Sequence, residues 1–407
     1  MDLLCLSNGH GEDAIAVRVL RALQQLSHPP NLAALPLVGE GVAYYKAGIR
    51  VLGPTQAMPS GGFIYMDQRQ MWGDLRAGLL GLTLGQWQTL QTWAKNGGKI
   101  FAVGDIFPLA MAWASGADYA FLGTAKSEYY LRDETHRLPG RPSSEGWGGS
   151  IYLPWERWLM GHRRCHYAFV RDQLTADYLH RCGVVADYVG NPMMDGLEVD
   201  PTALSRLTAS FPPAEPVITL VLIPGSRAPE AFENWQRILV ALESVAQTFA
   251  DRQLRLLGAI SPGLNLAVLS DILQERQWQP HQSGAYPSFS RGRAQLLLTQ
   301  DAFAECLHLA DAALATAGTA TEQAVGLGKP IFTLPGEGPQ FTYAFAEAQC
   351  RLLGPSLEMI ADPTQVGPAL AQCLGDSDRL QAIHVNGERR MGPPGAAREI
   401  GLRISRL

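Results

Sequence analysis

A glycine and two threonines link a short apolar run to a helical pattern in this chain of 407 residues. Residues 312–316 have the pattern of a buried strand, and Gly318 allows a close turn after it. Thr319 or Thr321 is then expected to cap a helix whose free N–H groups and positive dipole end suit a diphosphate. An acid or amide in the first turn of that helix can reach the hydroxyls of an attached ribose. The predicted contacts are therefore Gly318, Thr319, Ala320, Thr321 and either Glu322 or Gln323.

A second polar turn follows another buried run in the same half of the chain. Residues 217–223 read as a strand, and Gly225, Ser226 and Arg227 come directly after it. Glycine permits close backbone approach, serine offers a hydroxyl, and the arginine fork matches phosphate oxygens. The first turn alone fits a plain capped helix equally well. Because ligands of open α/β sheets bind outside the carboxyl ends of the strands, two such turns favour one shared anion.

A third polar loop, over residues 335–342, leaves the next expected strand and opens a helix. Glu337, Gln340 and Thr342 are candidates for hydrogen bonds to sugar hydroxyls, although a plain helix entry has the same pattern. The three loops contain no Asp-x-Asp pair, which is a common metal-binding arrangement. We therefore expect Arg227 and the helix N-termini to meet the phosphate charge, with no metal and no cofactor.

Short apolar runs alternate with helical patterns along the second half, which is typical of a parallel sheet covered by helices. The first half begins in the same way, with a strand, a turn and an amphipathic helix. Two long irregular inserts, residues 54–73 and 134–154, interrupt it. The expected strands are residues 3–7, 32–38, 99–103, 119–122, 167–170, 185–190, 217–223, 254–260, 295–299, 312–316 and 330–334.

The chain is long enough to predict two hydrophobic cores. The turn residues near Asn191 and Pro192 are typical of a crossing between domains. The sequence therefore predicts an α/β protein with an N-terminal Rossmann-like domain over residues 1–192 and a second one over 193–375. Residues 376–407 are expected to form a helical tail that docks onto another domain.

Composition narrows the class of protein. A formal net charge of −5 argues against a protein whose main task is to neutralise nucleic-acid phosphates. The six cysteines are scattered without a Cys-x-x-Cys pair, which favours reduced thiols. The N-terminus lacks the pattern of a signal peptide, and no apolar run is long enough to span a bilayer. We expect a cytoplasmic protein whose membrane contact, if any, is peripheral.

The two glycine turns, together with Val-Gly-Asn-Pro at residues 189–192, resemble motifs of the lipid-A-disaccharide synthases and of related proteins. The resemblance covers about residues 185–354 well and the first half more weakly. It implies a GT-B fold, with two Rossmann-like domains facing a central cleft, and the use of UDP-sugars. Two features depart from the family. The loop at residues 7–13 lacks the usual Gly-Glu-x-Ser-Gly-Asp pattern, and the position of the family acid is occupied by Gln323.

Such a glycosyl transfer with inversion needs a base for the acceptor hydroxyl. His10 lies in the first strand-to-helix turn and has a suitable intrinsic pKa. Asp105 also leaves a strand end, and the resemblance aligns it with the family's catalytic aspartate. We favour Asp105, with His10 or Asp13 in support; a helix N-cap is the alternative role for Asp105.

Aromatic and basic residues interleave in the first half, as they do at a lipid headgroup surface. The run near His162 and His166 matches no standard zinc spacing. A further apolar stretch lies at residues 72–93, and packing of aromatic residues in the core explains these patterns equally well. The interleaved residues are Trp155, Arg157, Trp158, Leu159, Met160, Arg163 and Arg164.

Together these features predict an inverting, metal-independent transferase that moves a sugar from a UDP-sugar to a lipid or lipid-linked acceptor. We expect possible peripheral contact with the cytoplasmic membrane face and no nucleic-acid partner. A UDP-N-acetylglucosamine 2-epimerase is one alternative, and a non-catalytic protein that binds nucleotide sugars is another.

Overall fold

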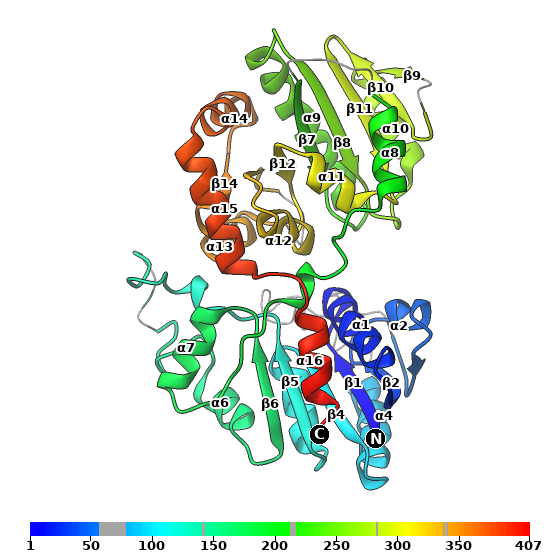
Figure 1. Ribbon diagram of the computed structural model, residues 1–407, viewed down its shortest axis with the longest axis vertical. Coiled ribbons are helices and arrows are strands. Elements are labelled where there is room, and N and C mark those ends of the chain that lie inside the picture. Colours follow the sequence, from blue (N-terminus) through cyan, green and yellow to red (C-terminus); the bar gives the residue numbers. More distant parts are fainter. Residues whose placement is uncertain are drawn as a thin grey trace. The chain divides into compact units, whose positions relative to one another are not determined.

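The computed structural model describes residues 1–56, 79–140, 142, 144–211, 217–281, 284–336, 338 and 341–407. The chain forms two compact units, whose elements are labelled in Figure 1. Unit 1 comprises Met1–Asp195 together with Pro393–Leu407, and unit 2 comprises Gly196–Gly392. The chain therefore crosses between the units twice. From the sequence we predicted a single crossing after residue 192 and a separate tail over residues 376–407.

Unit 1 contains a six-stranded sheet in the order β3-β2-β1-β4-β5-β6, and neighbouring strands run parallel. Leu3, Leu4 and Leu6 of β1 are fully buried, as expected of a strand with helices on both faces. The strands are β1 (Asp2–Ser7), β2 (Asn31–Pro36), β3 (Arg50–Val51), β4 (Lys99–Gly104), β5 (Tyr119–Gly123) and β6 (Cys165–Val170).

The helices of unit 1 cover this sheet. The last helix of the chain packs closely on the first, since a side chain at Gly401 would lie 3.5 Å from Leu23. The described helices are α1 (His10–Gln24), α2 (Val42–Lys46), α4 (Leu79–Lys95), α5 (Ile106–Ala114), α6 (Pro154–Met160), α7 (Gln173–Arg181) and α16 (Ala396–Ile404), with short 3-10 turns at Glu128–Tyr130 and Pro192–Met194.

Unit 2 contains an eight-stranded sheet in the order β14-β13-β12-β7-β8-β11-β10-β9. Its neighbours run parallel except where β10 pairs with β9 and β11. Without this antiparallel edge, the order of strands is that of unit 1. The strands are β7 (Val217–Ile223), β8 (Gln253–Ala259), β9 (Gln279–His281), β10 (Ser288–Arg291), β11 (Ala294–Thr299), β12 (Ala312–Ala315), β13 (Ile331–Thr333) and β14 (Leu357–Met359).

The core of unit 2 forms where α9 covers the sheet. Trp235 is fully buried there and lies close to Gly258 of β8, where a side chain would meet its ring at 3.5 Å. The helices are α8 (Pro201–Ala209), α9 (Glu230–Thr248), α10 (Leu266–Glu275), α11 (Phe303–Leu309), α12 (Thr319–Gly326), α13 (Tyr343–Leu353), α14 (Val366–Leu374) and α15 (Ser377–Met391), with 3-10 turns at Gly354–Ser356 and Pro363–Gln365.

The α/β class and the paired Rossmann-like topology are confirmed, but one predicted strand is wrong. Residues 185–190 contribute only an isolated parallel bridge from Asp187 to Phe169. Val185 is 79% exposed whereas Ala186 is fully buried, so the segment lies at the border of the core and pairs at one residue only. The strands β3, β9, β10 and β14 were not predicted, because they are short and have no continuous apolar run.

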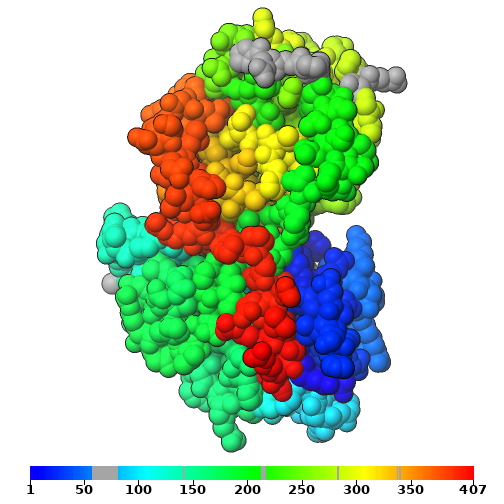
Figure 2. Space-filling model, in the orientation of Figure 1, coloured from blue at the N-terminus to red at the C-terminus, as the bar shows by residue number. Residues whose placement is uncertain are grey.

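The C-terminal residues form two helices rather than one. Helix α15 belongs to unit 2, whereas α16 belongs to unit 1. Both are visible at the surface in Figure 2, coloured orange to red. The left-handed backbone at Gly392 and Gly395 allows the turn between them. Most of the irregular insert predicted at residues 54–73 lies outside the described residues.

Candidate functional site

Both sheets have a point at which the order of strands reverses. In unit 1 the chain moves outward from β1 to β3 and then returns to β4 on the other side of β1. In unit 2 the equivalent neighbours are β7 and β12. Ligands of such sheets bind at the carboxyl ends of the two strands at this reversal. The predicted site residues of each unit follow these strands, except those of the third loop, such as Gln340, which come after β13.

The turn after β7 approaches the end of β12 closely. Gly225 has a φ of +109°, and a side chain there would lie 3.3 Å from the carbonyl oxygen of Thr316. The amide of Thr316 in turn donates a hydrogen bond of 2.9 Å to the carbonyl of Ile223. Only glycine suits this position without strain. The two turns predicted to share an anion therefore lie side by side within unit 2.

We expect Gly225→Ala to lower the free energy of unfolding by about 1–2 kcal/mol, because it forces a left-handed backbone on a residue with a side chain. Gly263→Ala is the matched control, since a side chain at Gly263 meets nothing within 4 Å. Urea denaturation of both variants measures the difference. Equal stability of the two variants would contradict the assignment of strain to Gly225.

The side chains after Gly225 are open to solvent or partly so. Ser226 is exposed and Arg227 is partly exposed. Within the described part of the chain, the Arg227 guanidinium forms no hydrogen bond or ion pair. Its backbone carbonyl accepts from the amide of Ala231 at 2.9 Å, which fixes the residue at the start of α9. A permanently charged group is thus held at a strand end with no hydrogen-bond or ion-pair partner for its guanidinium among the described residues.

Helix α12 begins without a side-chain cap. Its N-cap residue is Gly318, which has no side chain that could accept a hydrogen bond from the first turn. The prediction that Thr319 or Thr321 caps the helix is therefore wrong. Thr319 is the first helical residue, and the hydroxyl of Thr321 instead donates to the carbonyl of Ala317 at 2.6 Å. The uncapped N–H groups, including that of Ala320, remain suited to an anion.

The two candidates for a ribose contact differ in burial. Glu322 is partly exposed, whereas Gln323 is only 5% exposed and faces the core. Both residues have polar contacts within the protein. The carboxylate of Glu322 is therefore more accessible than the amide of Gln323, although Gln323 occupies the position of the family acid.

The third loop is described only in part, since Glu337 and Gln340 lie outside the described residues. The amide of Gly336 donates to the carbonyl of Phe341 at 3.1 Å, so the ends of the loop meet. Thr342, a predicted sugar contact, is the N-cap of α13, and its hydroxyl accepts from the amide of Phe345 at 3.1 Å.

In unit 1, Asp13 belongs to a buried chain of hydrogen bonds. The hydroxyl of Ser7 donates to its carboxylate at 2.5 Å, and the hydroxyl of Tyr44 donates to Ser7 at 2.6 Å. Asp13 is 2% exposed, and burial raises its pKa to about 7 despite the bond from Ser7. The buried carboxylate of Asp13 thus links α1 to the end of β1, whereas His10 is exposed at the start of α1.

Asp105 connects the turns after β1 and β4. Its carboxylate accepts from the amide of Phe107 at 2.9 Å, which makes it the N-cap of α5. It also accepts a hydrogen bond from the side chain of Asn8, which follows β1. Burial raises the pKa of Asp105, and these hydrogen bonds and the charge of Lys126 oppose that rise. Asp105, which is 9% exposed, therefore has the predicted role of N-cap, and its carboxyl group has a raised pKa.

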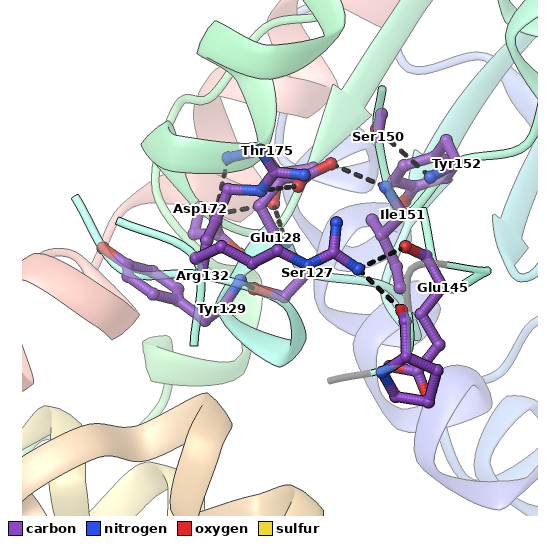
Figure 3. A network of polar contacts seen from close by, with 12 residues as sticks. Ser127, Glu128, Tyr129, Arg132, Glu145, Ser150, Ile151, Tyr152, Asp172 and Thr175 are labelled. Atoms are coloured by element: carbon purple, nitrogen blue, oxygen red, sulfur yellow. Dashed lines mark hydrogen bonds and ion pairs between the residues drawn. The ribbon is translucent and has the colours of Figure 1, made fainter. Parts of the chain in front are cut away.

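Buried charged residues that the motifs did not identify follow β5 and β6 (Figure 3). Glu128 is fully buried, pairs with Arg132 at 2.8 Å, and accepts from the amide of Ile151 at 2.7 Å. Asp172 accepts from the amide and the hydroxyl of Thr175 at 2.8 and 2.7 Å. This network ties the irregular segment before α6 to the sheet. The positions of Glu128 and Asp172 shortly after β5 and β6 were the sequence signal from which they could have been found.

A second buried pair lies near Asp105. Lys126 and Glu156 form an ion pair of 2.5 Å, and the Glu156 side chain is 1% exposed. Its carboxylate also accepts from the amide of Leu153 at 2.8 Å, at the start of α6. A salt bridge with these hydrogen bonds keeps a positive charge fixed close to the carboxyl edge of the sheet.

The interleaved tryptophans Trp155 and Trp158 are exposed on α6, and they form a row with Trp147, which precedes the helix and was not among the predicted residues. Trp147, Trp155 and Trp158 are 62%, 52% and 55% exposed. Trp147 and Trp155 have ring centroids 6.3 Å apart, and Trp158 packs edge-on against Trp113 at 5.2 Å. The alternative of core packing fails for these three tryptophans, although Leu159 and Met160 are buried. Residues 72–78 of the neighbouring apolar stretch lie outside the described residues.

No helix among the described residues is long and apolar enough to cross a membrane. None of the six cysteines forms a disulfide bond in the structure.

Comparison with known proteins supports the family resemblance. The family model described as lipid-A-disaccharide synthetase matches residues 175–333. Lipid-A-disaccharide synthase of Burkholderia mallei is 30% identical over 175 residues, which are 42% of this chain and 38% of the relative. The enzyme of Burkholderia thailandensis is 29% identical over the same share. The match to these relatives thus spans well under half of their length. Residues 175–333, which match the family model, contain both glycine turns of unit 2 but not the acid candidates of unit 1.

Solved structures share the fold over the whole chain. A Staphylococcus aureus MnaA–UDP structure covers 100% of this chain and 96% of its own, with 14% identity and a TM-score of 0.58. MurG of Acinetobacter baumannii gives 11% identity, coverage of 100% and 99%, and a TM-score of 0.56. The UDP-GlcNAc 2-epimerase of Neisseria meningitidis, bound to UDP-GlcNAc, gives 13% identity, full coverage of both chains and a TM-score of 0.54. These likenesses confirm the GT-B fold, and the protein is related to the lipid-A-disaccharide synthases.

Proposed function

We propose that this protein is a metal-independent, inverting glycosyltransferase that moves a sugar from a UDP-sugar to a lipid or lipid-linked acceptor. The observation that carries the proposal is the uncapped N-terminus of α12 beside Gly225, together with the Arg227 guanidinium, which has no partner among the described residues. Helix N–H groups and an arginine fork together suit a diphosphate. The family match over this same region supports UDP-sugar as the donor class.

The donor site lies in unit 2 at the reversal between β7 and β12. Backbone N–H groups at Gly318, Thr319 and Ala320 bind the diphosphate together with Ser226 and Arg227. As the bond between the sugar and the diphosphate breaks, negative charge develops on the leaving UDP, and these donors stabilise it in place of a metal. Glu322 binds the ribose, since it is the more accessible of the two candidates. Gln340 contributes from the third loop to sugar recognition.

The acceptor side lies in unit 1. The acceptor hydroxyl oxygen attacks the anomeric carbon from the face opposite UDP, the bond to UDP breaks, and the configuration inverts. Asp105 accepts the hydroxyl proton, because it follows a strand end and burial raises its pKa above the usual value of a carboxyl group. The exposed imidazole of His10 assists at the same edge, and the buried Asp13 holds the turn that carries it.

A product assay tests this function against its alternatives. Purified protein is incubated with UDP-sugars, with and without a lipid extract, and the products are analysed by mass spectrometry. We expect release of UDP and a glycosylated lipid only when lipid is present. Conversion of UDP-N-acetylglucosamine without any acceptor would instead indicate an epimerase. Tight UDP-sugar binding without turnover in either mixture would indicate a non-catalytic binding protein.

We further propose that the tryptophan row on α6 contacts the membrane surface from which the acceptor is taken. Tryptophan favours the interface between lipid and water, and Arg157, Arg163 and Arg164 lie near the row in the sequence and carry the charge that attracts anionic headgroups.

The double variant Trp155→Ala, Trp158→Ala is expected to weaken binding to vesicles of phosphatidylglycerol and phosphatidylcholine by about tenfold or more, because two interfacial anchors are lost. Vesicle sedimentation measures the bound fraction. Tyr45→Ala is the control, since Tyr45 is 61% exposed on another helix of unit 1. Equal binding of wild type and the double variant would exclude the tryptophan row as the contact surface.

A further inference from the structure

Two buried amide side chains hold backbone carbonyls in the turns of the proposed donor site. Asn234 of α9 is 2% exposed, and its Nδ2 donates to the carbonyl of Pro224 at 3.2 Å. Gln349 of α13 is 3% exposed, and its Nε2 donates to the carbonyls of Ala317 and Gly318 at 3.0 and 3.2 Å. Each amide therefore comes from a helix and reaches a turn at the end of a different strand.

The direction of each carbonyl fixes the direction of the next N–H group. In a planar trans peptide the C=O and N–H bonds point in opposite directions. The hydrogen bond to the carbonyl of Pro224 therefore turns the N–H of Gly225 away from α9. In the same way, the hydrogen bonds from Gln349 turn the N–H groups of Gly318 and Thr319 away from α13. Within the described part of the chain, no backbone carbonyl accepts from these three N–H groups. A flipped peptide would instead present a carbonyl oxygen to the anion and repel it.

The burial of Gln349 adds a second observation. Its Oε1 is buried without a hydrogen-bond partner among the described residues. A buried acceptor without a partner costs stability, and an apolar side chain of the same shape would avoid that cost. Stability alone therefore does not explain a glutamine at this position. Orientation of the turn at residues 317–318 does explain it.

We propose that Asn234 and Gln349 are positioning residues that orient the N–H groups of Gly225, Gly318 and Thr319 toward the diphosphate of the donor. The inference rests on the proposed donor site, and it adds which side chains orient the backbone of that site. Neither residue touches the ligand. Each acts through one turn, and the two turns meet at neighbouring strands β7 and β12.

The inference predicts a loss of affinity that depends on the phosphates of the ligand. Gln349→Met and Asn234→Leu remove the amide donors and keep side chains of similar size. We expect each variant to bind UDP about tenfold more weakly than wild type, because oriented N–H groups at a charged oxygen are lost. Binding of uridine, which lacks phosphates, should change less than twofold. Isothermal titration with UDP, UMP and uridine measures the three affinities.

Ser244→Ala is the matched control, because Ser244 also lies on α9 and donates to the carbonyl of Thr364 at 2.6 Å, in another part of unit 2. It should leave UDP binding unchanged. The melting temperature of Gln349→Met should equal or exceed that of wild type, so weaker UDP binding cannot be attributed to unfolding. If wild type prefers UDP over uridine and both variants keep that preference, the positioning role is wrong. If wild type itself shows no preference for UDP, the proposed donor site is wrong.

Discussion

Arg227→Ala is expected to weaken UDP binding by about 30- to 100-fold without lowering the melting temperature. A charge-assisted contact to phosphate contributes about 2–3 kcal/mol, and each 1.4 kcal/mol corresponds to about tenfold in affinity. The guanidinium has no hydrogen bond or ion pair in the described part of the chain, so its removal should cost no folding energy. Isothermal titration with UDP measures the change.

The control for this variant is Arg291→Ala. Arg291 lies on β10, at the antiparallel edge of the same sheet, and forms only an exposed ion pair of 3.4 Å with Glu243. Its removal tests whether loss of any positive charge on unit 2 weakens UDP binding. An equal loss of affinity in both variants would show that Arg227 acts through general charge and not through a direct contact.

Asp105→Asn is expected to lower the turnover rate by about 1,000-fold, because removal of a general base costs between about 10² and 10⁴. Asparagine can still accept the hydrogen bond from the amide of Phe107, so the N-cap of α5 survives. Binding of UDP should stay unchanged, since Asp105 belongs to unit 1 and the donor turns belong to unit 2. Steady-state kinetics and titration of the same preparation separate these two effects.

The pH dependence gives a second readout for Asp105. Only the ionised carboxylate accepts a proton, so the rate should rise with pH through the raised pKa of Asp105 and level off above it. In Asp105→Asn this rise should disappear. A comparable loss of activity in His10→Gln, with the rise retained in Asp105→Asn, would transfer the role of base to the imidazole.

The two turns of the proposed donor site could be located from the sequence because their geometry depends on local patterns. The apolar runs at β7 and β12 and the glycines after them specify strand ends, and neighbouring parallel strands bring those ends together. The residues that hold these ends could not be predicted in the same way. Asn234 and Gln349 lie within ordinary helical patterns, and only the packing of α9 and α13 shows which carbonyls their amides reach.

The acid candidates of unit 1 were harder to rank from sequence. His10 and Asp105 both follow strand ends, whereas Asp13, predicted only in support, is 2% exposed and accepts a hydrogen bond from Ser7. The cap of α12 was predicted wrongly because a threonine near a helix start usually caps it, whereas Thr321 faces the core and bonds back to Ala317. The prediction of a strand at residues 185–190 was wrong, because a short apolar run does not by itself show whether the segment pairs with a neighbouring strand.

A crystal structure of the protein in complex with UDP tests the central claim most directly. The account predicts electron density for the diphosphate at the turn after β7 and the N-terminus of α12, with the Arg227 guanidinium and the amides of Gly318 and Thr319 within hydrogen-bond distance of its oxygens. Density for UDP elsewhere on the protein, or a diphosphate that contacts neither Arg227 nor α12, would contradict it.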